Sequence, residues 1–94
     1  MFHRKQLEAD GGIIEIKIWR VPVSKIKPEG IKYSLVYIVS GKRLAGYDNA
    51  EGKGHHRHYK GKETSYIFQS IGRLFADFQK DIRRIKKSAM GGKL

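Results

Sequence analysis

The spacing of apolar residues changes once along this chain, near Ser70, and this change limits the folds that the chain can adopt. Before it, residues 13–21 and 31–40 carry apolar side chains at every second position, which is typical of β-strands. After it, apolar residues recur every three or four positions, as on one face of an α-helix: Ile71, Leu74, Phe75, Phe78, Ile82 and Ile85. The order predicts an α+β fold, an antiparallel sheet with one long C-terminal helix packed across one face.

The sheet is expected to contain about four strands, at residues 13–21, 31–40, 43–49 and 55–60. Gly41 tolerates a positive φ and predicts a tight hairpin, which with Gly41-Lys42 as its loop would put Asp48 on the core-side face. Residues 64–68 are extended but short, either a further strand or a lead-in to the helix, and Ser70 is the expected N-cap of the helix. Residues 1–94 should form a single domain with flexible ends at 1–11 and 89–94.

Positive charge dominates the composition, with 20 Lys and Arg against nine Asp and Glu in 94 residues, a net charge of +11. Most of the excess lies in residues 50–94, where eleven bases face four acids. Such an excess favours a polyanionic partner, most simply RNA or DNA. The chain has no cysteine, which excludes disulfides and thiolate metal sites. No secretory signal or membrane span is recognisable, so we expect a cytoplasmic protein without a membrane partner.

The segment Tyr47–Tyr59, "YDNAEGKGHHRHY", concentrates groups that can transfer protons or hold phosphate. In a strand, His56 and His58 would share one face and His55 and Arg57 the other. Histidine can act as general acid or base near neutral pH, an aspartate can orient it, and basic side chains can hold a phosphate. These roles make four residues catalytic candidates: His55, His56, His58 and Asp48. Five others are substrate-binding candidates: Tyr47, Asn49, Lys53, Arg57 and Lys60.

Two other interpretations of the cluster remain open. Asp48, His56 and His58 could bind a divalent metal, because two histidines in an H-x-H strand can reach one ion. Alternatively, the segment is only a basic surface strand. A phosphate-binding P-loop is excluded, since Lys53 is not followed by the required Ser or Thr and no helix begins there. The basic run Arg83–Lys87 at the helix end is either a solvated face, an RNA clamp or a docking surface for an acidic partner.

The same cluster, followed by Tyr66, Phe68 and the helical "LFADFQKDI", resembles the TumE-like family of small toxins from prokaryotic toxin–antitoxin systems. The resemblance extends from about Tyr33 to Ile85. It implies a cytoplasmic toxin whose partner is an antitoxin with a DNA-binding domain. It also marks the residues from Tyr47 to Asn49 and from Lys53 to His58, glycine excepted, as candidate functional positions.

These observations predict a toxin that acts on RNA, as a small ribonuclease that uses neither metal nor cofactor. The alternative is a non-catalytic basic module that binds nucleic acid or protein. An exposed edge strand would permit a homodimer or docking of the antitoxin.

Overall fold

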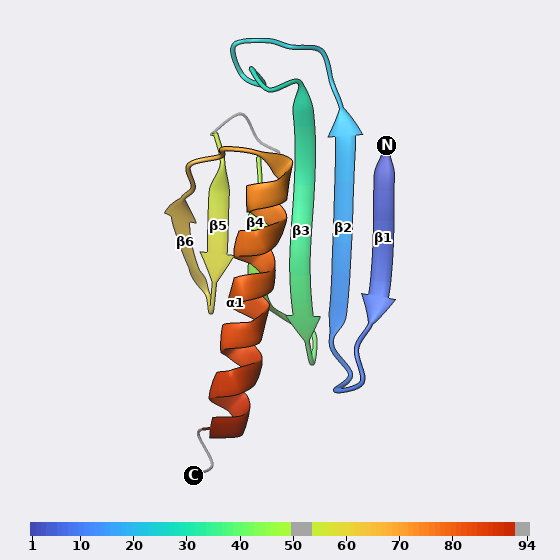
Figure 1. Cartoon of the computed structure of the whole chain (residues 1–94), viewed down its shortest axis with the longest axis vertical. Helices are drawn as coiled ribbons and strands as arrows, with labels where there is room; N and C mark the ends of the chain where they lie inside the picture. Colours follow the sequence, from blue (N-terminus) through green and yellow to red (C-terminus); the bar gives the residue numbers. More distant parts are fainter. Residues whose placement is uncertain (50–53, 92–94) are drawn as a thin grey trace.

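A computed structural model describes residues 1–49 and 54–91, and its elements form one sheet and one helix (Figure 1). The sheet is antiparallel and its strands follow one another in chain order. The helix lies on one face of this sheet, which confirms the predicted α+β class. The elements are β1 (Phe2–Leu7), β2 (Ile13–Arg20), β3 (Ile31–Val39), β4 (Lys42–Asp48), β5 (His56–Tyr59), β6 (Lys62–Ser65) and α1 (Ile71–Gly91).

The sheet has six strands, two more than expected, and both additional strands are at its edges. Residues 1–11 were expected to be flexible, but β1 pairs with β2 from Phe2↔Ile18 to Leu7↔Ile13. β6 pairs with β5 through a tight turn in which Lys60 and Gly61 both have positive φ. β1 and β6 are exposed along their whole length, so neither shows the apolar alternation by which a strand is recognised.

The hairpin between β3 and β4 turns at Ser40-Gly41, whose φ angles are 52° and 75°. This turn lies one residue before the predicted loop. A register shift next to Tyr37 and Ile38 follows, after which Leu35 pairs with Tyr47 and Ser34 with Asp48. A one-residue change of register moves every side chain of a strand to the other face. The prediction that Asp48 lies on the core-side face was therefore wrong, because Tyr47 occupies that face.

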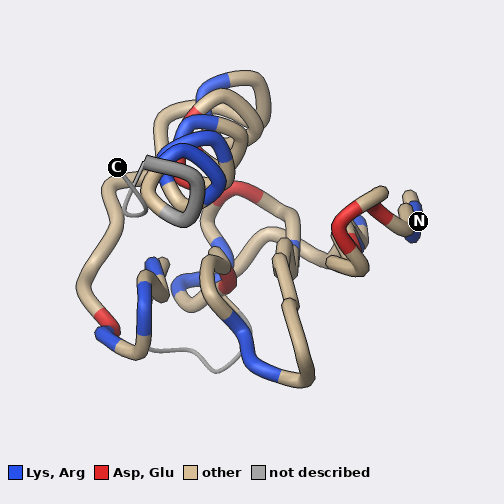
Figure 2. The backbone as a smooth tube through the Cα atoms, turned by 90° about the horizontal axis from the view of Figure 1, so that it is seen from below, with Lys and Arg blue, Asp and Glu red and all other residues tan. Residues whose placement is uncertain are grey.

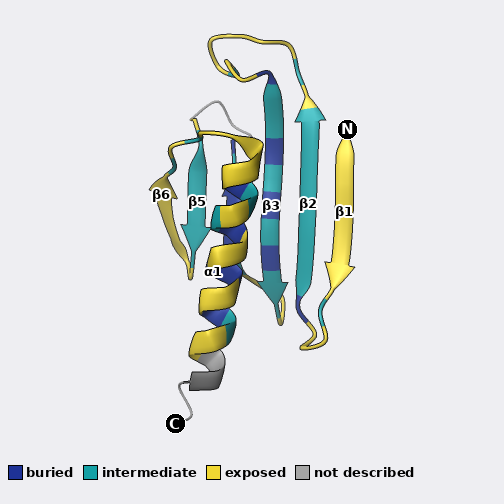
Figure 3. Ribbon diagram, viewed as in Figure 1, coloured by how far each residue is buried: buried dark blue, intermediate teal, exposed yellow. Residues whose placement is uncertain are grey.

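The core forms where α1 crosses the middle of the sheet. From the helix, Leu74, Phe78, Ile82 and Ile85 are buried, as their spacing predicted (Figure 3). They pack against one face of β3 and β4, where the buried residues are Tyr33, Leu35, Tyr37, Ala45 and Tyr47. Ser70 caps the helix as expected, since its Oγ accepts the Arg73 N–H at 3.0 Å.

The sheet therefore has two faces with different environments, which we call the helix face and the open face. The helix face carries the core, and no element of the described chain is packed on the open face (Figure 1). Residues that pair across strands share a face. Because Asp48 pairs with His56, and Gly46 with His58, these side chains are on the open face, whereas Tyr47 and its partner Arg57 are on the helix face. No helix of the described residues is both long and apolar enough to cross a membrane.

Candidate functional site

Asp48 and His58 meet on the open face, at the end of β4 and the middle of β5. The distance from Asp48 Oδ2 to His58 Nε2 is 3.0 Å, which is a hydrogen bond. On the other side of the ring, Arg43 Nη2 lies 3.0 Å from His58 Nδ1. The histidine side chain is only 14% exposed and that of the aspartate 26%. Asp48 is thus within hydrogen-bonding distance of one of the three histidines with which it was grouped.

The partners on the two sides of the ring indicate which tautomer of a neutral His58 fits this arrangement. A guanidinium has only donors, so a hydrogen bond from Arg43 requires an unprotonated Nδ1. The matching tautomer carries its proton on Nε2 and donates it to Asp48. Its Nδ1 lone pair points toward the exposed Arg43, and the Glu63 carboxylate is 3.9 Å from the same nitrogen. Such a ring can act as a base at Nδ1 once the arginine moves away.

His56 lies beside this pair on the same face, two residues from His58 in β5. Its Nδ1 is 3.2 Å from the Glu63 carboxylate of β6. Its Nε2 is buried and has no hydrogen-bond partner among the described residues. Buried polar atoms are normally paired, so this nitrogen is an exception within the cluster. His56 therefore has one ring nitrogen next to a carboxylate and one that is free for a further contact.

His55 is separated from the other two histidines and is packed into an aromatic stack. Its ring contacts those of Tyr33 and Phe68, with centroid distances of 5.7 and 5.0 Å, and these two rings also contact each other at 5.8 Å. The Tyr33 hydroxyl is 2.8 Å from Nδ1, and Glu29 is 3.3 Å from Nε2. Both ring nitrogens are occupied by protein groups. The structure brings His56, His58 and Asp48 together but leaves His55 outside the group.

Arg57 and Tyr47 form a separate network on the helix face with Asp81 of α1. Arg57 donates from Nε and Nη2 to the two carboxylate oxygens of Asp81, at 2.9 and 2.8 Å. The Tyr47 hydroxyl donates to the same carboxylate at 2.6 Å. The hydrogen bond to Asp81 raises the pKa of Arg57, and burial raises the pKa of Tyr47. Neither side chain is on the face of His56 and His58, so the sheet divides the cluster from which Tyr47 and Arg57 were predicted as substrate-binding residues.

Two of the remaining substrate-binding candidates, Asn49 and Lys60, make their contacts away from His58. Asn49 is buried, and its side chain accepts the Tyr33 N–H at 2.8 Å and donates to the Ile31 carbonyl at 3.0 Å. These two hydrogen bonds connect the end of β4 to the backbone of β3. Lys60 lies in the β5–β6 turn, with its ammonium 5.7 Å from the Tyr59 ring. Lys53 is outside the described residues.

Several side chains of this region were not identified from the sequence. Arg43 and Glu63 reach the histidines only because β4 and β6 flank β5. Asp81 was not among the predicted site residues, although it is only 4% exposed and pairs with Arg57. Nothing in the sequence indicated that this aspartate is buried, because its partner Arg57 is 24 residues away in the chain.

A polar hollow lies on the helix face, between α1 and the sheet. Its volume is about 240 Å³, and it is lined by Tyr47, Arg57, Tyr66, Asp77, Lys80, Asp81 and Arg84. Asp77 accepts a hydrogen bond from the Tyr66 hydroxyl at 2.5 Å and another from Arg73 at 3.1 Å. Both acids of this hollow are therefore paired within the protein.

The metal interpretation requires the carboxylate and both imidazoles at one point. Within residues 1–49 and 54–91, no three His, Asp or Glu side chains are arranged so that they could hold a metal ion. Asp48 is hydrogen-bonded to one histidine, and the other histidine is next to Glu63. The described geometry thus gives the metal interpretation no support.

Comparison with known protein families places this basic α+β domain among the toxins. The family model described as "Toxin TumE" matches residues 2–86, almost the whole chain. The chain belongs to the TumE toxin family, which confirms the resemblance noted from the sequence. A toxin family of this kind implies a cognate antitoxin as partner. Searches of curated proteins and of solved structures found no match.

Proposed function

We propose that this toxin cleaves RNA without a metal ion, with Asp48 and His58 as its central groups. The observation that carries the proposal is the 3.0 Å hydrogen bond from His58 Nε2 to Asp48, with Arg43 at the opposite nitrogen. An oriented imidazole beside an exposed guanidinium supplies a base and a phosphate ligand in one place. The open face above them is free of other elements of the described chain, so a strand of RNA can lie along it.

In the proposed reaction, Arg43 turns from His58 to a phosphate oxygen, which frees the Nδ1 lone pair. His58 then takes the proton of the ribose 2′-hydroxyl, and the 2′-oxygen attacks phosphorus. The bond from phosphorus to the 5′-oxygen breaks, and that oxygen takes a proton from a general acid. The products are a 2′,3′-cyclic phosphate and a 5′-hydroxyl. Asp48 holds the ring and stabilises the imidazolium that forms, while Arg43 stabilises the charge on the phosphate oxygens.

His56 is the proposed general acid. Its Cα lies about 6.6 Å from that of His58, as expected for residues i and i+2 of a strand, so the two rings can approach one phosphate from different sides. Glu63, 3.2 Å from His56 Nδ1, gives the protonated ring an anionic partner. The proton would leave from Nε2, the atom without a partner among the described residues, after a rotation that brings it to the surface.

The open face also offers a surface for the neighbouring nucleotide. Trp19 is only partly buried there, and the Lys32 ammonium lies 5.5 Å from the centre of its ring. Trp19 is two strands from Asp48 and two residues further along, a separation of about 12 Å. An indole beside a cation at this distance can stack a base while the phosphate lies near His58.

The test compares His58→Ala with His3→Ala. His3 is a matched control, because it is also paired with a carboxylate, Glu15 at 2.7 Å, on the same face but outside the cluster. Each purified protein is incubated with end-labelled RNA in the presence of a chelator, and the products are resolved on a gel. We expect the wild type and His3→Ala to leave 2′,3′-cyclic ends, and His58→Ala to lose at least about 100-fold in rate. Growth arrest in cells whose RNA stays intact would contradict the proposal.

The exposed side of α1 supports a second candidate, a binding module without catalysis. Lys and Arg positions recur along this helix (Figure 2). Five of them are exposed: Arg73, Lys80, Arg83, Arg84 and Lys87. Such a surface binds phosphates with an affinity that falls steeply with salt. Toxicity that survives His58→Ala but is lost when the helix arginines and lysines are replaced would favour this candidate over the nuclease.

A further inference from the structure

The helix face of the sheet is only partly covered. Six strands span about 24 Å between the two edges, whereas one helix with its side chains is about 10 Å wide. In Figure 1, α1 passes in front of β4 and between β3 and β5, and leaves β1 and β2 without a covering element. A sheet face that carries apolar side chains is normally covered by a packed layer. This face therefore lacks a layer over its N-terminal strands.

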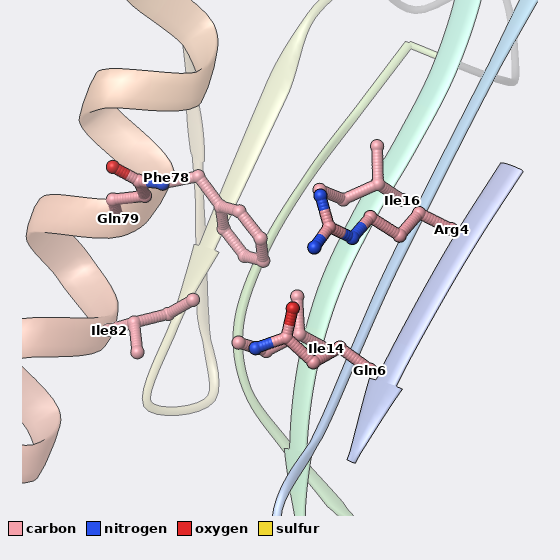
Figure 4. A pocket seen from close by; sticks show the side chains of 7 residues that line it. All are labelled: Arg4, Gln6, Ile14, Ile16, Phe78, Gln79 and Ile82. Atoms are coloured by element: carbon pink, nitrogen blue, oxygen red, sulfur yellow. The ribbon is translucent and has the colours of Figure 1, made fainter. Parts of the chain in front are cut away.

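The uncovered strands carry apolar side chains on that face. Ile14, Ile16 and Ile18 of β2 are only partly buried, although they pair with the core residues of β3. Phe2, the partner of Ile18 in β1, is 47% exposed. A groove of about 210 Å³ runs between these strands and α1 (Figure 4). We call it the β1–α1 groove, and it is lined by Arg4, Gln6, Ile14, Ile16, Phe78, Gln79 and Ile82.

The border of the β1–α1 groove is positively charged. Arg4 projects over it from β1 (Figure 4) and makes no ion pair within the described residues. Arg83 is exposed and lies one helical turn after Gln79, on the same side of α1. No acidic side chain is among the residues that line the groove. An apolar floor between two arginines is complementary to a segment with apolar residues on one face and carboxylates on its flanks.

We propose that the β1–α1 groove is the docking site of the antitoxin, and that an acidic amphipathic helix of the antitoxin occupies it. The helix would lie beside α1 and complete the second layer over β1 and β2. β2 is eight residues long, about 26 Å, which a helix of about 17 residues would match. The groove is on the face opposite to Asp48 and His58, so this inference does not depend on the proposed ribonuclease activity.

Two pairs of neighbouring residues provide matched tests, because each pair has the same charge and exposure but points to different sides. Arg4 faces the groove, whereas Lys5, paired with Glu15, faces the open side of the sheet. Arg83 lies on the groove side of α1, whereas Arg84 lines the hollow next to β4 and β5. The cognate antitoxin is titrated calorimetrically onto Arg4→Glu, Lys5→Glu, Arg83→Glu and Arg84→Glu, after circular dichroism has confirmed that each variant is folded.

We expect Arg4→Glu and Arg83→Glu to weaken antitoxin binding at least about tenfold, and the other two to change it less than about threefold. Equal weakening by Arg4→Glu and Lys5→Glu would instead indicate pairing along the β1 edge and would overturn the helix proposal. It would also be overturned if the toxin alone formed a dimer that Arg4→Glu dissociates, since a second copy would then occupy the groove. Unchanged binding by all four variants would exclude the groove as the docking site.

Discussion

Replacing Arg57 by Met should destabilise the protein more than any other change in the described part of the cluster. The substitution keeps much of the side-chain volume but removes both hydrogen bonds to Asp81, at 2.9 and 2.8 Å, and the one to the Tyr47 hydroxyl at 3.2 Å. The Asp81 carboxylate, whose side chain is 5% exposed, would keep only the hydrogen bond from Tyr47. It would be a buried charge without a counterion.

The two partners of this ion pair are exposed to different degrees, and the expected losses differ accordingly. Leaving a buried charge unpaired costs about 3–5 kcal/mol, which we expect for Arg57→Met. In Asp81→Asn the remaining cation is Arg57, whose side chain is 29% exposed and can turn toward water. That substitution should cost about 1–3 kcal/mol, and Tyr47→Phe about 1–2 kcal/mol for one buried hydroxyl. A chain of this length is stabilised by about 5–14 kcal/mol in total, so the Arg57 variant loses a large share.

Urea denaturation followed by circular dichroism at 222 nm measures these losses. The double variant Arg57→Met/Asp81→Asn completes a thermodynamic cycle and should be more stable than Arg57→Met alone, because the unpaired carboxylate is gone. An Arg57→Met variant within about 1 kcal/mol of the wild type would refute the reasoning. So would a greater loss in Asp81→Asn than in Arg57→Met. Either result would return Arg57 to the role of a phosphate ligand that the sequence had suggested.

Three further substitutions test other parts of the fold. Asn49→Ala should cost about 2–3 kcal/mol in urea denaturation, because it leaves a buried N–H and a partly buried carbonyl of β3 without their side-chain partner; a fully stable variant with weaker RNA binding would instead show a substrate contact. Gly41→Ala should cost about 1 kcal/mol through its φ of 75° alone, since a Cβ there meets no atom within 4 Å; an unchanged denaturation midpoint would contradict this. The hydrogen bond from Lys86 lowers the pKa of Glu8, so Glu8→Gln should cost up to about 1 kcal/mol at pH 7. This cost should decrease as the pH falls through the lowered folded-state pKa, below which the carboxyl is protonated in both folded and unfolded chains; a loss independent of pH would show another cause.

The strands and the helix that were predicted correctly are those in which the spacing of apolar side chains reflects burial. The alternation of residues 31–40 corresponds to β3, and the stripe from Ile71 to Ile85 corresponds to the buried side of α1. β1 and β6 were missed because edge strands in water need no apolar side chains, and their hydrogen bonds to a neighbour leave no trace in composition. Strand existence was thus predictable for the inner strands and not for the edges.

Register was less predictable than strand position, and it decides which groups form the site. Ser40-Gly41 and the shift beside Tyr37 displace β4 by one residue from the predicted pairing. That displacement sends Tyr47 into the core and Asp48 to the open face. The predicted loop Gly41-Lys42 and the observed turn Ser40-Gly41 both place Gly41 in the turn, so local turn preferences could not distinguish the two registers. The choice reflects burial of the tyrosine ring, a contact with α1 that lies more than twenty residues further along the chain.

The two faces of β4 and β5 separate residues that the sequence places next to one another. Asp48 and His58 face the open side, while Tyr47 and Arg57, their immediate neighbours, are held by Asp81 in the core. The face of the sheet on which a side chain lies, rather than its place in the sequence cluster, therefore indicates whether it is available to a ligand or held in the core. Substitutions on the open face should alter toxicity with little change in unfolding free energy, whereas those on the helix face should act through stability. Toxicity and stability measured side by side for these four residues would separate a catalytic surface from a structural one, whichever reaction the toxin performs.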